Sequence, residues 1–257
     1  MNPELEQKLA HSLTAEDTGL VPFLPYLLQD LWELGGSGKT TVALLKKYLA
    51  AGAEVLDLAC GKGAVSIRIA KETGWRVKGV DLLPEFVAEA AAKAEGQGVA
   101  ALCTFRQGDA NKAVETERNW DVVVFSASGN VLGTPEETLQ KLSGVVRPGG
   151  YILLDESYLK DGADSTLFEH DYRPYTEWAA LFHRFGLEEL EQVDTTEEEE
   201  DHNDSDLAAI AARVEELAAQ YPEKAAMFRQ YLQSQQNEVD DIENKLVNVV
   251  WLLRKKA

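Results

Sequence analysis

Short apolar runs alternate with longer amphipathic stretches along most of the chain. Apolar runs of about four to eight residues are typical of buried strands, whereas apolar positions spaced by three and four are typical of helices. Because helical segments separate the runs, the pattern predicts an α/β protein with a parallel, doubly wound sheet that binds its ligand at the carboxyl ends of the strands. The seven predicted strands are Glu54–Asp57, Val77–Val80, Thr104–Gln107, Val122–Phe125, Tyr151–Asp155, Leu187–Asp194 and Leu246–Leu253.

Helical spacing also appears before the first strand and between the last two. Apolar residues from Phe23 to Leu34 predict an amphipathic helix. About 50 residues separate strands six and seven, beginning with the acidic run 197–201, which we expect to be a linker or the lead into a helix. Two amphipathic helices follow, with Pro222 opening the second. Their apolar faces need a partner: the body of the domain, a second subunit in a homodimer, or a substrate that they cover as a lid. Packing on the body or in a dimer is favoured.

The predicted organisation therefore has three parts. Residues 1–51 form an N-terminal helical cap region. Residues 52–196 and 245–257 form the sheet domain, and residues 197–244 form a helical insertion before the last strand.

The composition is that of a globular protein with an acidic surface. The 257 residues are 45% hydrophobic and carry 25 Lys and Arg against 44 Asp and Glu, a formal charge of −19. Such a surface repels a phosphate backbone, so we expect no nucleic acid as a partner. The start of the chain lacks a leader pattern, and no apolar run reaches the roughly 18 residues typical of a membrane span, so a cytoplasmic protein with no membrane partner is expected. Cys60 and Cys103 are too few for a disulfide framework and are not spaced as metal ligands, so no metal is expected.

The stretch ELGGSGKTT, residues 33–41, looks at first sight like the phosphate-binding loop of nucleotide hydrolases. That loop follows a strand and begins with a glycine, but Glu33 stands at the glycine position and helical spacing precedes it. The alternative is that Gly35 and Gly36 end one helix and Ser37 caps the next. A nucleotide hydrolase is therefore an alternative function that the pattern does not favour.

The better organised signal lies in residues 54–81. A strand runs into the turn DLACGKG (residues 57–63), a helix follows, and a second strand ends in Asp81, which together indicate a β-α-β unit. Glycines permit close approach of the backbone to a ligand, and an acid at the end of the second strand can accept both hydroxyls of a ribose. A nucleoside cofactor is indicated. The dinucleotide pattern Gly-x-Gly-x-x-Gly is not met, because Ser66 stands at the third glycine position.

The stretch VLDLACGKG (residues 55–63) resembles the first motif of class I S-adenosylmethionine-dependent methyltransferases, with Ala59 in place of the usual first glycine. The resemblance continues in chain order through VDLLPEFV (80–87), FRQGDA (105–110), WDVVVFSA (120–127) and LSGVVRPGGYILLD (142–155). It implies a seven-stranded, mostly parallel sheet of the Rossmann-like methyltransferase fold, with the seventh strand antiparallel beside the fifth and RPGG as a turn before the fifth. It also implies S-adenosylmethionine as the cofactor.

The same resemblance implies a set of cofactor-binding residues. Asp57 would lie near the methionyl amino group, Asp81 would accept the ribose hydroxyls, and Asp109 would accept from the adenine amino group, although each of these acids could simply end a strand or face solvent. Cys60 is expected to be a small residue of the turn and not a nucleophile. The full expected set is Asp57, Ala59, Cys60, Gly61, Gly63, Asp81, Leu82, Asp109, Ala110, Phe125 and Ser126.

These patterns predict a methyltransferase that acts on a small-molecule acceptor. A protein that binds the cofactor without transferring methyl, or a relative with other chemistry such as aminopropyl transfer, remains an alternative because a fold does not settle a reaction. We expect the acceptor to meet the N-terminal helices, the loop after strand four and the segment Glu156–Tyr175, which holds Tyr158, His170, Asp171 and Tyr172. Methyl transfer relies on proximity and alignment, so no catalytic base is assigned, and His170 is the first candidate to mutate.

Overall fold

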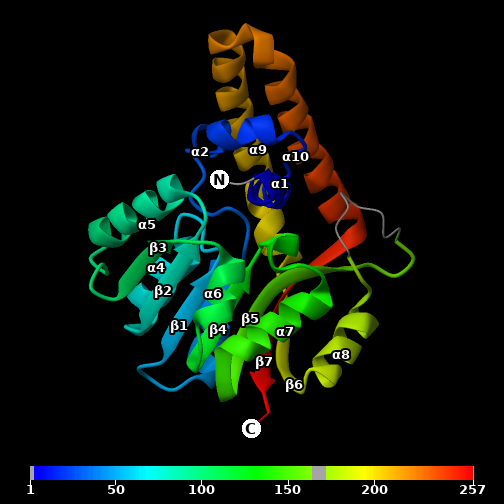
Figure 1. Ribbon diagram of the computed structural model, residues 1–257. Coiled ribbons are helices and arrows are strands. Elements are labelled where there is room, and N and C mark those ends of the chain that lie inside the picture. Colours follow the sequence, from blue (N-terminus) through cyan, green and yellow to red (C-terminus); the bar gives the residue numbers. More distant parts are fainter. Residues whose placement is uncertain (1–2, 164–171, 257) are drawn as a thin grey trace.

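A single sheet of seven strands organises the protein. The computed structural model describes residues 3–163 and 172–256, and its strands are ordered β3-β2-β1-β4-β5-β7-β6 (Figure 1). The first five strands are parallel, whereas β7 runs antiparallel to both β5 and β6. The strand order reverses between β1 and β4, which is where open α/β sheets bind ligands. The strands are β1 (Glu54–Leu58), β2 (Arg76–Asp81), β3 (Cys103–Gln107), β4 (Trp120–Ser126), β5 (Val146–Leu159), β6 (Leu187–Asp194) and β7 (Leu246–Lys255).

All seven predicted strands are present, and the antiparallel placement of β7 beside β5 is confirmed. The predicted RPGG turn, residues 147–150, falls inside the bounds of β5 but outside its paired positions. Val146 already pairs with Trp120, and the register shifts before Tyr151 pairs with Val122. The extra residues are therefore accommodated as a bulge. At its other end β5 extends to Leu159 because β7 pairs with it along that whole length.

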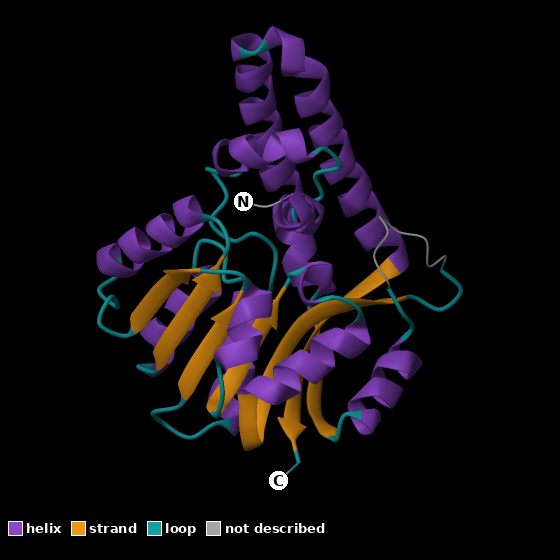
Figure 2. Ribbon diagram, viewed as in Figure 1, coloured by secondary structure: helices purple, strands orange, loops and turns teal. Residues whose placement is uncertain are grey.

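Helices cover both faces of the sheet (Figure 2). Alternate residues of a strand point to opposite faces, so Leu56 and Leu58 of β1 belong to one apolar cluster and Val55 to the other. The first cluster is closed by α6 (Ala110–Thr116), α7 (Pro135–Val145) and α8 (Tyr175–Arg184). The second is closed by α3 (Gly38–Tyr48), α4 (Ala64–Thr73) and α5 (Pro84–Gly96).

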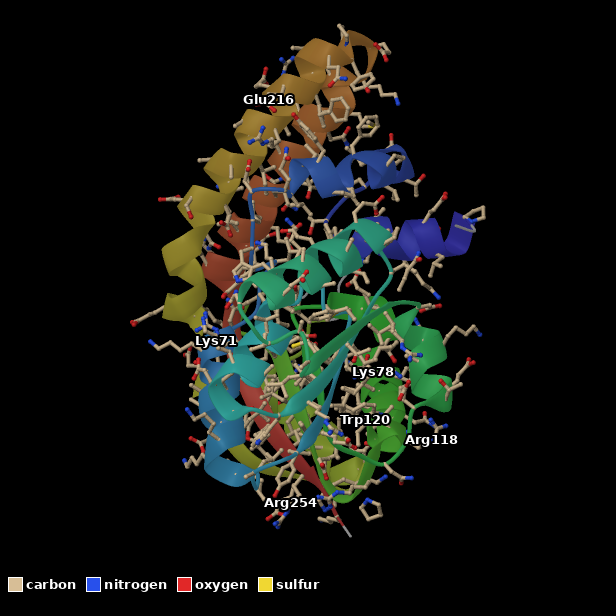
Figure 3. All side chains as sticks on the ribbon, turned by 90° about the vertical axis from the view of Figure 1, so that its left-hand side faces the viewer. Lys71, Lys78, Arg118, Trp120, Glu216 and Arg254 are labelled. Atoms are coloured by element: carbon tan, nitrogen blue, oxygen red, sulfur yellow. The ribbon has the colours of Figure 1, made fainter. Side chains whose placement is uncertain are left out.

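The helical insertion is a hairpin of two long helices. It consists of α9 (Thr196–Gln220), a short 3-10 turn (Pro222–Lys224) and α10 (Ala225–Lys245), which runs directly into β7. The acidic run 197–201 is thus the first part of α9, as a helix lead and not a linker. The hairpin stands over the carboxyl ends of the strands, at the opposite end of the molecule from the chain's C-terminus (Figure 1). In the turned view Glu216 of α9 lies near that upper end and Arg254 of β7 at the lower end (Figure 3).

The N-terminal region packs on this hairpin. It contains α1 (Pro3–Ser12), a 3-10 helix (Thr18–Phe23) and α2 (Leu24–Leu27). One buried cluster joins the two regions and includes Leu9, Leu24 and Leu27 from the first with Val214 and Phe228 from the second. We refer to residues 3–37 and 196–245 together as the helical cap. The apolar faces of the insertion are therefore covered within the chain.

The predicted helix from Phe23 to Leu34 is wrong beyond its first turns. The apolar positions are buried as expected, including Leu28 and Leu31, but helical structure ends at Leu27. The carbonyls of Leu28 and Leu31 accept hydrogen bonds from the side chain of Lys62, which lies on another part of the chain. The spacing thus indicated burial correctly, while the backbone of this stretch makes its polar contacts with a cation from a distant part of the chain.

Candidate functional site

A deep cleft lies between the carboxyl ends of the central strands and the helical cap. It encloses about 1000 Å³, part of which is open to solvent. Its floor comes from the turns that follow β1, β2, β3 and β4, and its roof and one wall come from α1 and residues 32–35. A concave site lined by apolar side chains with a few polar groups is typical of small-ligand binding.

The turn after β1 has an unusual backbone. Ala59, Gly61 and Gly63 have φ values of 56°, 52° and 77°, in the left-handed region that costs a residue with a Cβ roughly 1–2 kcal/mol. Ala59, which stands where the motif usually has glycine, therefore adopts a conformation that favours glycine, with strain of the kind that concentrates at functional sites. Gly63 does not line the cleft. A Cβ at Gly63 would lie 2.8 Å from the ring of Phe105 and 2.9 Å from Cβ of Ala90, so this glycine serves close packing beneath the turn.

Asp81 ends β2 with its carboxylate held by the backbone. Its Oδ2 accepts from the N–H of Gly61 at 2.8 Å, and its Oδ1 accepts from the N–H of Leu83 at 2.9 Å. Burial raises the pKa of this carboxyl, and these backbone N–H groups oppose the rise. Because a carboxylate has about four acceptor positions, Asp81 can still accept hydroxyl hydrogens from a ligand in the cleft that it lines.

Asp57 provides a second carboxyl in the floor of the cleft. It is 2% exposed, and Ser66 of α4 donates its hydroxyl to Oδ2 at 2.5 Å. Burial raises the pKa of Asp57 from 3.8 to about 7, the nearby Asp81 adds to the rise, and the Ser66 hydrogen bond opposes it. A cation placed beside Asp57 would favour its ionised form. Ser66, which breaks the dinucleotide pattern in the sequence, is therefore the hydrogen-bond donor to this acid.

The turns after β2 and β3 complete the floor. Leu82 and Ala110 both line the cleft and offer apolar surface suited to a flat base. Asp109 caps α6 by accepting from the N–H of Asn111 at 2.8 Å. The Asn111 side chain in turn donates to the carbonyl of Val131 at 2.9 Å, which ties this turn to the loop after β4.

The last two expected residues lie at the end of β4, and only one of them lines the cleft. Ser126 lines the cleft and donates its hydroxyl to Asp155 at 2.7 Å. Phe125 is 1% exposed in the core of the sheet and does not line the cleft. The next residue, Ala127, lines the cleft with a φ of 45°, a second strained position at this site.

Residues 33–41, which look like a phosphate-binding loop, make a different contact in the structure. A turn and not a strand precedes residues 37–41, and α3 begins at Gly38. The N–H of Ser37, at the start of this helix, donates to the buried carboxylate of Asp155 at 2.7 Å. A helix N-terminus favours an anion, and here the chain supplies its own. Lys39, the lysine of the GKT sequence, is exposed and does not line the cleft.

The structure brings nine of the eleven expected residues to the cleft, all except Gly63 and Phe125. It also adds residues that motif spacing did not identify, notably Lys62, Trp32 and the α1 residues Leu5 and Leu9. Lys62 could have been identified from the sequence because it stands between two glycines of the turn. No local signal marked α1, because a helix meets the cleft only through the tertiary fold.

The segment Glu156–Tyr175 gives a different result. Tyr158 packs against Tyr175 and Trp251, with ring centroids 5.7 and 6.1 Å apart, and neither tyrosine lines the cleft. Tyr172 packs on a small cluster around Leu159. His170 and Asp171 lie outside the described residues. Among the described residues, the expected acceptor contact of this segment is therefore not seen.

The comparisons with known proteins agree with this geometry. Residues 49–198 match the family model described as a methyltransferase domain. The ubiquinone/menaquinone biosynthesis C-methyltransferase UbiE of Bdellovibrio bacteriovorus is 33% identical over 107 residues, which are 41% of this chain and 45% of that protein. The ribosomal protein L11 methyltransferase of Dechloromonas aromatica is 32% identical over 150 residues, 57% of this chain and 45% of that protein. The chain thus matches less than half the length of these two curated relatives.

A solved structure matches over a longer stretch. The S-adenosylmethionine-dependent methyltransferase of Geobacter sulfurreducens, in complex with S-adenosyl-L-homocysteine, is 27% identical with a TM-score of 0.70. The match covers 85% of this chain and 90% of the other. The chain therefore belongs to the class I S-adenosylmethionine-dependent methyltransferase family, and S-adenosylmethionine is the cofactor of its fold. The described helices contain none that is long and apolar enough to cross a membrane.

Proposed function

We propose that this protein transfers the methyl group of S-adenosylmethionine to a small-molecule acceptor held between the cofactor and the helical cap. The observation that carries the proposal is the shape of the cleft. The same cavity is lined by the acids and the strained turn on the sheet side and by α1 on the cap side. A bound adenosyl group would therefore leave its remaining space under the α1 roof.

The residues present fit an adenosyl ligand. Asp81 is held at the end of β2 as a ribose acceptor, and Leu82 and Ala110 give apolar faces for a base. Asp57 offers a buried carboxyl that an ammonium group would ionise. When bound, S-adenosylmethionine supplies a methyl group on a sulfonium for displacement by a nucleophile. The chain's part is to bind, align and exclude water, which suffices for a reaction governed by proximity.

The acceptor side favours a small molecule with apolar surface. Leu5 and Leu9 of α1 and Leu13 just after it line the cleft together with Lys8 and Ser12. A roof of this kind restricts access by a folded macromolecule, and the charge of −19 disfavours nucleic acid. One relative is named for ubiquinone and menaquinone biosynthesis and another for a ribosomal protein. The small-molecule alternative is the one that a cleft roofed by α1 supports.

Calorimetric titration with S-adenosylmethionine, S-adenosylhomocysteine and Mg-ATP tests the cofactor. We expect micromolar binding of the two adenosyl ligands. In Asp81→Ala this affinity should fall by about 100-fold or more, because the ribose hydroxyls and the buried backbone N–H groups all lose their acceptor. Asp161→Ala, at an exposed position, is the matched control and should bind normally. Binding of Mg-ATP alone would contradict the proposal and would return residues 33–41 to the role of a phosphate loop.

The acceptor is tested by transfer of labelled methyl. The wild-type protein is incubated with labelled cofactor and either a fraction of metabolites or the proteins of a cell extract. Label in the metabolite fraction, absent with Asp81→Ala, is the expected result. Label in protein only would replace the small-molecule acceptor by a protein, and tight cofactor binding with label in neither would indicate a cofactor-binding protein without transfer.

A further inference from the structure

Lys62 is a buried cation in the middle of the turn after β1, residues 59–63, which we call the cofactor turn because the proposed function places the adenosyl ligand there. Its side chain is fully buried, and Nζ donates to the carbonyls of Leu28 and Leu31 at 2.7 and 2.8 Å. Both carbonyls lie just after α2, in a stretch that is not helical, and the Leu28 carbonyl also accepts from the N–H of Leu31 at 3.1 Å. A side chain of the floor therefore holds the backbone of the cap.

The segment that Lys62 holds is a wall of the cleft. We call residues 28–37 the wall segment; Trp32, Leu34 and Gly35 of this segment line the cavity. Its other end is fixed by the N–H of Ser37, which donates to Asp155 at 2.7 Å. The wall segment is thus attached to the sheet domain at both ends, by a lysine of the β1 turn and by a carboxylate of β5.

A counter-charge accompanies the buried ammonium. Glu89 of α5 lies 3.2 Å from Nζ of Lys62 and also 3.3 Å from Nζ of Lys93. Lys93 in turn lies over the ring of Trp32, 3.9 Å from its centroid. Burial lowers the pKa of Lys62, and the Glu89 carboxylate opposes this. A buried charge is costly unless it is paired and hydrogen-bonded, so the wall segment and α5 together keep this cation in place.

The same segment continues the connection into the insertion. Asp30, between the two bound carbonyls, receives two hydrogen bonds from Arg213 of α9 at 2.6 and 3.1 Å. The β1 turn, the wall segment and α9 are therefore joined in one chain of polar contacts. A movement of the turn on ligand binding would therefore be transmitted to the cap through the hydrogen bonds of Lys62.

We propose that Lys62 is a positioning residue that fastens the wall segment to the cofactor turn, so that cofactor affinity depends on the seating of the cap. The inference rests on the proposed function only in that the turn binds the adenosyl ligand. Lys62 acts through the backbone of residues 28–31 and takes no part in the chemistry. The cofactor turn thereby has two faces, one toward the ligand and one toward the cap.

The test compares Lys62→Met, which keeps the length and loses the donors, with Lys39→Met at an exposed position of α3. Amide hydrogen exchange is measured in the free proteins, and affinity for S-adenosylhomocysteine is measured by calorimetry. In Lys62→Met we expect amides of residues 28–36 to exchange at least about tenfold faster while β1 and β4 keep their protection, together with a loss of about tenfold in affinity. Lys39→Met should match wild type in both measurements.

Two results would overturn the inference: an unchanged affinity in a folded Lys62→Met protein, or exchange that accelerates equally in the wall segment and in the central strands. The second pattern would mark a general loss of stability. If Lys62→Met does not fold, Glu89→Gln is compared with Glu85→Gln on the same helix. We then expect faster wall-segment exchange and weaker binding for Glu89→Gln alone, and equal behaviour of the two variants would refute the role of Lys62.

Failure of this inference differs visibly from failure of the proposed function. If wild-type protein does not bind S-adenosylhomocysteine, the function fails. The exchange rates of the free variants still report whether Lys62 holds the wall segment.

Discussion

The two sides of the cleft are encoded in different ways. The floor comes from one continuous part of the chain, residues 57–131, in which each strand delivers its turn in order. The cap comes from residues 3–37 and 196–245, which lie far apart in the chain and share a single apolar cluster. Local spacing can specify the first, whereas only long-range packing can assemble the second.

The forces on the two sides also differ. On the floor, Asp57 and Asp81 are buried acids held by a hydroxyl and by backbone N–H groups. In the cap, apolar contacts such as the edge-on packing of Phe23 on Phe228, with centroids 5.0 Å apart, are supplemented by surface ion pairs. We therefore expect changes on the floor to affect affinity and changes in the cap to affect stability first.

The largest expected effect tests whether the cap folds with the sheet. Phe228 is fully buried between the two cap regions, so Phe228→Ala should lower the free energy of unfolding by about 3–5 kcal/mol. Urea unfolding followed by circular dichroism and by tryptophan fluorescence measures it, with the exposed Glu223→Ala as control. Two separate transitions would show that the cap is an independent unit, contrary to the shared cluster.

The next effect separates backbone strain from close packing in the turn after β1. Gly63 and Gly74 begin and end α4 with φ values of 77° and 72°, but a Cβ at Gly74 would meet nothing within 4 Å. Gly74→Ala should cost about 1 kcal/mol from its φ alone. Gly63→Ala should cost a further 1–3 kcal/mol or so from overpacking and should weaken S-adenosylhomocysteine binding. Equal losses in thermal unfolding of the two variants would contradict the packing role of Gly63.

A pH titration sharpens the role assigned to Asp57. With its pKa raised to about 7 by burial, Asp57 is protonated in the free protein below that pH, and an ammonium group of the ligand requires the ionised form. Affinity for S-adenosylhomocysteine should therefore fall as pH decreases below about 7, by up to about tenfold per unit. Calorimetry at several pH values measures this, and the slope should disappear in Asp57→Asn.

The raised pKa of Asp57 makes the stability of the ligand-free protein depend on pH in the opposite direction from ligand affinity. A carboxyl whose pKa is higher in the folded state favours folding when protonated, so its contribution is present below pH 4 or so and is lost as pH rises through about 7. Stability of the ligand-free protein that rises over this interval in wild type, relative to Asp57→Asn, would contradict the burial of an ionisable Asp57.

The smallest effect concerns the surface contact between the wall segment and α9. Asp30 and Arg213 are joined by two hydrogen bonds at an exposed position, where ion pairs contribute little to stability. A double-mutant cycle of Asp30→Asn and Arg213→Met, followed by thermal unfolding in low and high salt, should show a small coupling that salt weakens. A large, salt-independent coupling would mean that this pair and not the apolar cluster holds the cap.

The sequence by itself determined the sheet domain and most of the floor. Asp81 could be placed because an acid at the end of the second strand of a β-α-β unit must lie beside the glycine turn, and the structure puts it 2.8 Å from the N–H of Gly61. The strand positions could also be predicted from the sequence, because apolar runs and helical spacing are local properties of the chain.

Only the tertiary structure decided the cap and the contacts that cross the cleft. The apolar spacing from Phe23 to Leu34 indicated burial, but it did not show that the backbone leaves the helix and that its carbonyls at residues 28 and 31 accept hydrogen bonds from Lys62. The structural role of residues 33–41 likewise depends on a tertiary contact, in which Asp155 accepts a hydrogen bond from the N–H of Ser37. Both contacts join residues more than 30 positions apart, and periodicity carries no information about such pairs because it reports the face of an element and not the partner that this face meets.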